Sequence, residues 1–280
     1  MALTVNTNTT SLGVQKNLNR ATDALATSMT RLSSGLKINS AKDDAAGLQI
    51  ATRMTSQIRG QTMAIKNAND GISIAQTAEG AMQEQTNILQ RMRELAVQSR
   101  NSSNSEEDRV ALNKEFGAMS DELTRIANST QLNGKDLLNS GVTMTFQVGS
   151  NTGSDNQIKI TLADLTAATL GVSSGAIFIT GTESDIETNF NNAIDAIDTA
   201  LQSINSTRAD LGAAQNRLTS TVNNLQNINE NAEAARGRVQ DTDFAAETAQ
   251  LTKQQTLQQA STSVLAQANQ LPSAVLKLLQ

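Results

Sequence analysis

Two acidic clusters have the residue types that could bind a metal ion, Asp43-Asp44 and Asp241 with Asp243. Hard divalent cations prefer carboxylate oxygens, but neither cluster has the loop spacing of an EF-hand calcium site. We therefore interpret both clusters as solvated helix ends or as ion pairs between subunits. We expect no metal ion and no other cofactor.

The chain contains no Cys and no His. Without Cys it cannot form a disulfide, a thiolate nucleophile or an iron–sulfur cluster. Without His it has no imidazole base, no Ser-His-Asp triad and no HExxH metallopeptidase helix. The sequence therefore predicts a protein that is not an enzyme.

The composition is poor in large core-forming side chains. The 280 residues include five Phe, no Trp, no Tyr and one Pro. Alanine lets helices approach closely but contributes little apolar area, so long contacts between helices must replace a compact core.

Charge and hydropathy exclude two classes of partner. The net charge of −5 is concentrated between residues 140 and 200, and no basic patch typical of nucleic-acid binding is present. No apolar run reaches the roughly 18 residues that a membrane span needs. The N-terminal sequence MALTVNTNTT also lacks the features of a secretory signal peptide.

Both ends of the chain carry apolar residues at seven-residue spacing, which is typical of coiled coils. The N-terminal row is Leu18, Leu25 and Leu32, and the C-terminal row is Leu257, Val264, Leu271 and Leu278. Neither row can be buried by its own helix. We expect the two rows to form an assembly seam with each other and with neighbouring copies, which indicates a self-assembling subunit.

Helical patterns fill most of the chain between these rows. Residues 44–100 have an apolar repeat of seven, and Ser105 with Asp108 forms a capping-box start for the next helix. Asn133-Gly134 indicates a turn. A further helix starts near Ser184, and its apolar stripe includes the polar residues Arg208, Gln215 and Asn229. These three either fix the register of the helices or lie at a seam edge.

Short β-type runs interrupt the helices at 143–148, 157–160 and 176–179. The predicted fold is therefore mainly α. A long antiparallel helical bundle or coiled coil is formed by both termini, with a small β-rich region at the distal tip.

Four segments together resemble bacterial flagellins. They are RLSSGLKINSAKDDAAGLQI at 31–50, NANDGISIAQTAEG at 67–80, QRMRELAVQS at 90–99 and VLKLLQ at 275–280. They cover both terminal thirds of the chain and occur in the order in which flagellins have them.

The resemblance implies a structural subunit that polymerises into the extracellular flagellar filament for motility. It implies an inner core from 1–42 with 240–280, an outer core from 43–139 with 182–239, and a short variable insert at 140–181. The alternative is a flagellin-like adaptor at the junction of hook and filament. The VLKLLQ end and the QRMRELAVQS stretch favour the filament subunit.

The resemblance also implies partners other than the chain itself. It implies export in an unfolded state through the flagellar type III apparatus, and contacts with cap and hook-junction proteins. An export chaperone is expected to bind the C-terminal arm, where Leu265, Val275, Leu276 and Leu279 could dock together with Leu271 as an amphipathic helix.

Flagellins carry a patch that a vertebrate Toll-like receptor recognises, and Arg91, Leu95 and Glu115 match it in this chain. The alternative is structural. Leu95 would then pack in the outer core, and Arg91 with Glu115 would form an ion pair between two helices.

Overall fold

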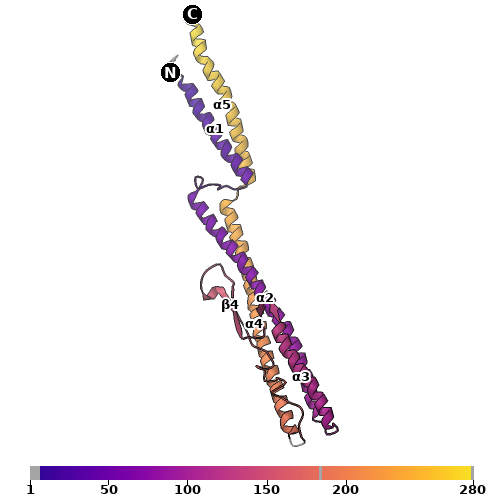
Figure 1. Cartoon of the computed structure of the whole chain (residues 1–280). Helices are drawn as coiled ribbons and strands as arrows, with labels where there is room; N and C mark the ends of the chain where they lie inside the picture. The colour runs from indigo at the N-terminus through magenta and orange to yellow at the C-terminus, as the bar shows by residue number, and fades with distance from the viewer. Residues whose placement is uncertain (1–6, 183–184, 279–280) are drawn as a thin grey trace. The chain divides into compact units, whose positions relative to one another are not determined.

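The computed structural model describes residues 7–182 and 185–278, with side chains up to residue 270. The described residues form five long α-helices: α1 Thr9–Ser34, α2 Ala45–Ser99, α3 Glu106–Ser129, α4 Ile186–Gln240 and α5 Phe244–Leu278 (Figure 1). Two hairpins lie between α3 and α4. They are β1 Gln131–Leu132 with β2 Lys135–Asp136, and β3 Val142–Gln147 with β4 Gln157–Leu162. A short 3-10 helix, η1 Ser154–Asn156, precedes β4.

The chain divides into two compact units. Unit 1 contains residues 1–58 and 230–280, and unit 2 contains residues 59–229. α2 and α4 each contribute to both units, whereas α1 and α5 belong to unit 1.

In unit 2, α2 buries a row of small and medium side chains. Its buried apolar residues recur three, four or seven positions apart, at Ala64, Ala68, Ala75, Ala78, Met82, Leu89, Met92 and Ala96. This spacing keeps one stripe of a helix against its neighbours. α4 has the same pattern, at Ala193, Ile197, Ala200, Ile204, Leu211, Ala214 and Leu218. The predicted long helices are therefore confirmed.

The core of unit 2 approaches α2 closely at Gly71. A Cβ atom at this position would lie 3.2 Å from Leu218 Cδ1 of α4 and 3.3 Å from the ring of Phe146 on β3. Glycine here lets a helix and a strand approach α2 together.

The predicted start of α3 is confirmed in detail. Ser105 is the N-cap, its hydroxyl accepts from the Asp108 N–H at 3.1 Å, and Asp108 Oδ2 accepts from the Ser105 N–H at 3.0 Å. This reciprocal pair is a capping box. The turn at Asn133-Gly134 is confirmed too. Both residues have positive φ, 51° and 72°, as a tight two-residue hairpin turn requires.

The β3–β4 hairpin packs beside residues 60–74 of α2. Asn67 Nδ2 donates to the Gln147 carbonyl at 3.0 Å, and Gly60 approaches Ser150. Within unit 2 the hairpin therefore lies along the helix, away from the α2–α3 turn where a distal tip would be. The mainly α fold class with a small β region is confirmed.

The predicted strand at 176–179 is wrong. This segment is irregular, although Ile177 and Ile179 are buried. The Ile179 N–H donates to Asn113 Oδ1 of α3 at 3.0 Å. A side chain thus satisfies the backbone group that a strand partner would otherwise bind, so burial at alternate positions does not require a sheet.

Candidate assembly and recognition surfaces

The N-terminal leucine row lies in the contact between α1 and α5. Leu18, Leu25 and Leu32 are half-buried, and Ala21 and Ser28 are buried between them on the same face of α1. On α5 the matching face buries Gln254 and Ala268 and half-buries Leu251 and Leu265. The small side chains of Ala21, Ser28 and Ala268 are more buried in this contact than the leucines.

Polar bonds fix the antiparallel register of this helix pair (Figure 1). At one end the Asn8 amide donates to the Ala268 carbonyl at 2.8 Å, and the Ser11 hydroxyl donates to Asn269 Oδ1 at 2.8 Å. At the other end Arg31 Nη1 lies 3.7 Å from Glu247 Oε2. Bonds at both ends allow one alignment of α1 against α5.

The C-terminal row lies beside the face of α5 that contacts α1. Leu257 is 45% exposed and Val264 is 47% exposed. The side chains of Leu271 and Leu278 lie outside the described residues. The structure therefore brings the N-terminal row against α5 and leaves the described part of the C-terminal row facing outward.

Sequence reasoning missed the small residues of the α1–α5 contact. Ala21 and Ser28 are seven positions apart, as are Gln254, Ser261 and Ala268. This spacing was a usable signal. It was overlooked because the leucines beside it are more hydrophobic.

The segments that connect α1 to α2 and α4 to α5 are joined by main-chain hydrogen bonds. The Lys37 N–H donates to the Gln240 carbonyl at 2.7 Å, and the Thr242 N–H donates to the Gly35 carbonyl at 2.9 Å. Gly35 has φ 72°, the left-handed conformation that ends α1. We call this pairing the linker clamp. Sequence reasoning did not predict it, because main-chain pairing leaves little trace in residue types.

Side chains of the acidic clusters accept hydrogen bonds from nearby backbone N–H groups. Asp43 Oδ2 accepts from the backbone N–H groups of Ser40 and Asn39 at 2.9 and 3.2 Å. The hydrogen bonds from Ser40, backbone first, and from Asn39 lower the pKa of Asp43. Asp243 Oδ1 accepts from two N–H groups in the first turn of α5. Among the described residues, no group of three or more acidic side chains could hold a metal ion.

The three residues that match the receptor patch lie where α2 meets α3. Arg91 Nη2 is 2.8 Å from Glu115 Oε1, and the side chains are 48% and 42% exposed. The hydrogen bond to Glu115, followed by that to Glu94, raises the pKa of Arg91. Leu95 is fully buried in the core. The packing and the ion pair named as the structural alternative are thus present, and Arg91 and Glu115 remain accessible.

One of the residues expected to bind a chaperone can be placed. Leu265 is half-buried on the α5 face that contacts α1. The side chains of Val275 and Leu276, and the whole of Leu279, lie outside the described residues.

A mainly α protein whose N- and C-terminal helices pair in antiparallel orientation belongs to the class of helical-bundle proteins. Profiles of the bacterial flagellin N-terminal and C-terminal helical regions match residues 5–143 and 194–279. The chain is therefore a member of the bacterial flagellin family.

Similar proteins agree with this assignment. The chain is 41% identical to Flagellin A of Vibrio cholerae serotype O1 and 40% identical to polar flagellin C of Vibrio parahaemolyticus, over the full length of each chain. The first alignment runs over 379 positions although this chain has 280 residues, so this chain lacks segments that the relative has.

A solved structure of a putative flagellar hook-associated protein from Vibrio parahaemolyticus has a TM-score of 0.61 and 12% identity. It covers 71% of this chain and 100% of that one. At this identity the likeness shows the fold alone. Family membership makes this chain a structural subunit of the extracellular flagellar filament that self-polymerises, and not an enzyme. None of the described helices has the length and hydropathy needed to cross a membrane.

Proposed function

We propose that the chain polymerises through the α1–α5 pair, with 1–42 and 240–280 as the inner core of the filament. Residues 43–139 and 182–239 form the outer core, and 140–181 form the short insert. The observation that carries this proposal is the outward row of Leu257 and Val264 beside an already paired helix face. Such a row lacks cover in one copy, and neighbouring copies can bury it.

The double variant Leu257→Ser with Val264→Ser tests this proposal. Both side chains are about half exposed, so the monomer should keep its helical circular dichroism. Each would lose the apolar burial that a neighbouring copy supplies. We expect the critical concentration for polymerisation, measured by sedimentation, to rise at least about tenfold.

The matched control replaces Gln255 and Thr262 with serine. This pair has the same spacing on the same helix, and both side chains are exposed. It should polymerise like the parent chain. Equal critical concentrations for the two double variants would contradict an apolar seam at the C-terminal row.

Export through the type III apparatus is the route that this proposal requires. A chaperone would hold Leu265, Val275, Leu276 and Leu279 before export, while Leu265 is not yet covered by α1. Cap and hook-junction proteins are the expected partners at the filament ends.

We also propose that the exposed Arg91–Glu115 pair is recognised by a vertebrate Toll-like receptor on the free monomer. Arg91→Ala with Glu115→Ala should abolish the response of receptor-expressing reporter cells. Arg125→Ala with Glu122→Ala removes another exposed ion pair, on α3, and should not. Equal loss in both variants would contradict recognition at Arg91 and Glu115.

A further inference from the structure

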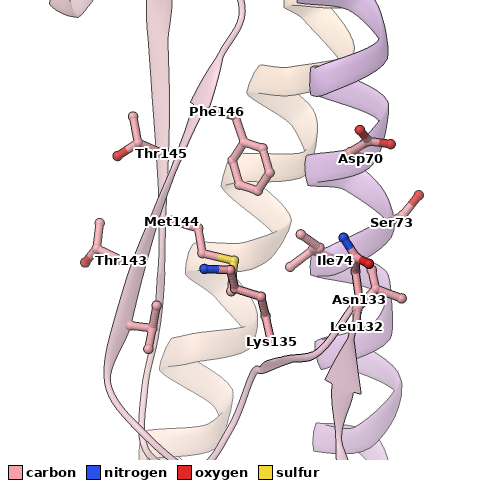
Figure 2. Close-up of a pocket in the computed structure, with 11 residues that line it drawn as sticks. Asp70, Ser73, Ile74, Leu132, Asn133, Lys135, Thr143, Met144, Thr145 and Phe146 are labelled. Carbon is pink, nitrogen blue, oxygen red and sulfur yellow. The ribbon is translucent and has the colours of Figure 1, made fainter.

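A groove of about 680 Å³ lies in unit 2 between β3, α2 and the β1–β2 hairpin. Its apolar lining includes Ile74, Leu132, Met144 and Phe146, and Figure 2 shows Met144 and Phe146 pointing from β3 toward α2. All five consecutive residues from Val142 to Phe146 line it. Because successive side chains of a strand point to opposite faces, a wall made of consecutive residues is the edge of the strand.

The groove lies at the edge of β3 that β4 does not occupy. β3 and β4 form a two-stranded antiparallel sheet in which Phe146 is opposite Ile158. The Val148 N–H donates to the Asn156 carbonyl at 2.8 Å and extends this ladder. Since hydrogen-bonded pairs alternate along such a ladder, even-numbered residues of β3 bond to β4.

The odd-numbered residues therefore direct their main-chain groups away from β4. The Gln147 carbonyl confirms this direction, because it accepts from Asn67 of α2. Among the described residues, the main-chain groups of Thr143 and Thr145 have no partner at that edge. The groove thus exposes the unpaired main-chain N–H and C=O groups of Thr143 and Thr145.

Two opposite charges line the groove. Figure 2 shows Asp70 at the level of Phe146 and Lys135 at the level of Met144. Within the described part of the chain neither forms an ion pair. An occupant that carries a positive charge toward Phe146 and a negative charge toward Met144 would complement both.

β3 also lacks the features that keep strand edges unpaired. Its sequence, VTMTFQ, has no charged residue and no proline, whereas β4 has Lys159. Natural edge strands are usually protected by such residues.

We propose that this groove binds an extended peptide of a partner protein, which adds to β3 as a third, antiparallel strand. The peptide carries a basic residue facing Asp70 and, two positions toward its C-terminus, an acidic residue facing Lys135. Apolar side chains at alternate positions contact Ile74, Leu132 and Met144. Strand addition of this kind takes affinity from main-chain bonds and specificity from alternate side chains.

The probe is the peptide VTKTETV with blocked ends and a fluorescent label, mixed with the full-length chain below its polymerisation threshold. Fluorescence anisotropy should show saturable binding. The reversed peptide VTETKTV has the same composition and should bind at least about tenfold more weakly, because both charges then face like charges. In the charge-swapped variant Asp70→Lys with Lys135→Glu this preference should invert.

The strand-addition step is tested separately with Thr145→Pro. Proline removes an outward N–H that β4 does not use, so the hairpin should stay intact while binding falls at least about tenfold. The matched control, Thr161→Pro, makes the same change at the equivalent position on the far edge of β4 and should bind like the parent chain.

Three results would overturn the proposal. They are failure of both peptides to bind, equal binding of the two peptides to parent and charge-swapped chains, and equal effects of the two proline substitutions. Circular dichroism of each variant separates loss of binding from loss of fold. A chain that pairs β3 with a second copy would sediment as a dimer without peptide, and that result would also overturn the partner-peptide assignment.

Discussion

The α1–α5 pair and the core of unit 2 use the same seven-residue spacing with different results. In unit 2, side chains such as Leu89, Phe116 and Leu123 are fully buried, because α2, α3 and α4 enclose them. Two helices alone cover one stripe on each other, so α1 and α5 keep their leucines half-buried and leave Leu12, Met29, Leu257 and Val264 exposed. A heptad repeat therefore predicts that a helix needs partners, and the number of partners decides how much is buried.

The largest expected effect is the loss of stability when a leucine in each region is replaced by alanine. Leu89→Ala should lower the free energy of unfolding by about 3 kcal/mol, because a fully buried leucine leaves a cavity. Leu25→Ala, in the half-buried row of α1, should cost about 1 kcal/mol. Urea unfolding of the monomer, followed by circular dichroism and by amide hydrogen exchange in each unit, measures both. If the two costs were equal, the two regions would not differ in packing as described.

A smaller change in stability is expected when two glycines of α2 are replaced by alanine. Gly71→Ala should destabilise by about 1 kcal/mol, because the new methyl group would crowd Leu218 and Phe146. Gly80→Ala meets nothing within 4 Å and should instead stabilise by about 0.5–1 kcal/mol, since alanine favours the helix. Thermal unfolding of both variants checks the opposite signs. Increased stability in both variants would mean that the side chains around Gly71 rearrange at little cost.

A third effect, of similar size, concerns the start of α3, where a local hydrogen-bonded cap and not core packing supplies the stability. Ser105→Ala removes one half of the capping box and should cost about 1 kcal/mol. It should also change the titration of Asp108. Hydrogen bonds from the Ser105 backbone and hydroxyl lower the pKa of Asp108 in the folded chain.

The sign of this pH dependence follows from the lowered pKa. The carboxylate contributes stability above the pKa of the unfolded chain, near 3.8, and that stability is lost as the pH falls through the lower folded value. NMR titration of the Asp108 carboxyl should therefore give a higher pKa in Ser105→Ala than in the parent chain. An unchanged pKa would show that the Ser105 hydroxyl does not hold the carboxylate.

Much of the fold could be predicted because it depends on local signals. Periodicity located the helices, Ser105 with Asp108 located the start of α3, and Asn133-Gly134 located a hairpin turn. The face of α5 that meets α1 could not be predicted. Leu257 and Gln254 both belong to seven-residue rows, and hydrophobicity favours the leucine, whereas close helix approach favours smaller side chains such as Ala268.

Contacts between distant parts of the chain could not be predicted from the sequence, for a different reason. The bond from Ile179 to Asn113 replaces a strand partner with a side chain 66 residues away. The groove beside β3 combines residues from three segments, around Asp70, Leu132 and Met144. No spacing along the chain encodes these meetings, because each depends on how the intervening helices pack.

The linker clamp has a mechanical consequence. Gly35 and Lys37 bond to Thr242 and Gln240 through main-chain atoms. The segment that connects α1 to α2 is therefore mechanically coupled to the segment that connects α4 to α5. Because no side chain makes these bonds, residue exchange at most of these positions would leave the coupling in place, with Gly35 excepted for its positive φ. In a rotating polymer, such coupling would let both connecting segments transmit torque at the same time.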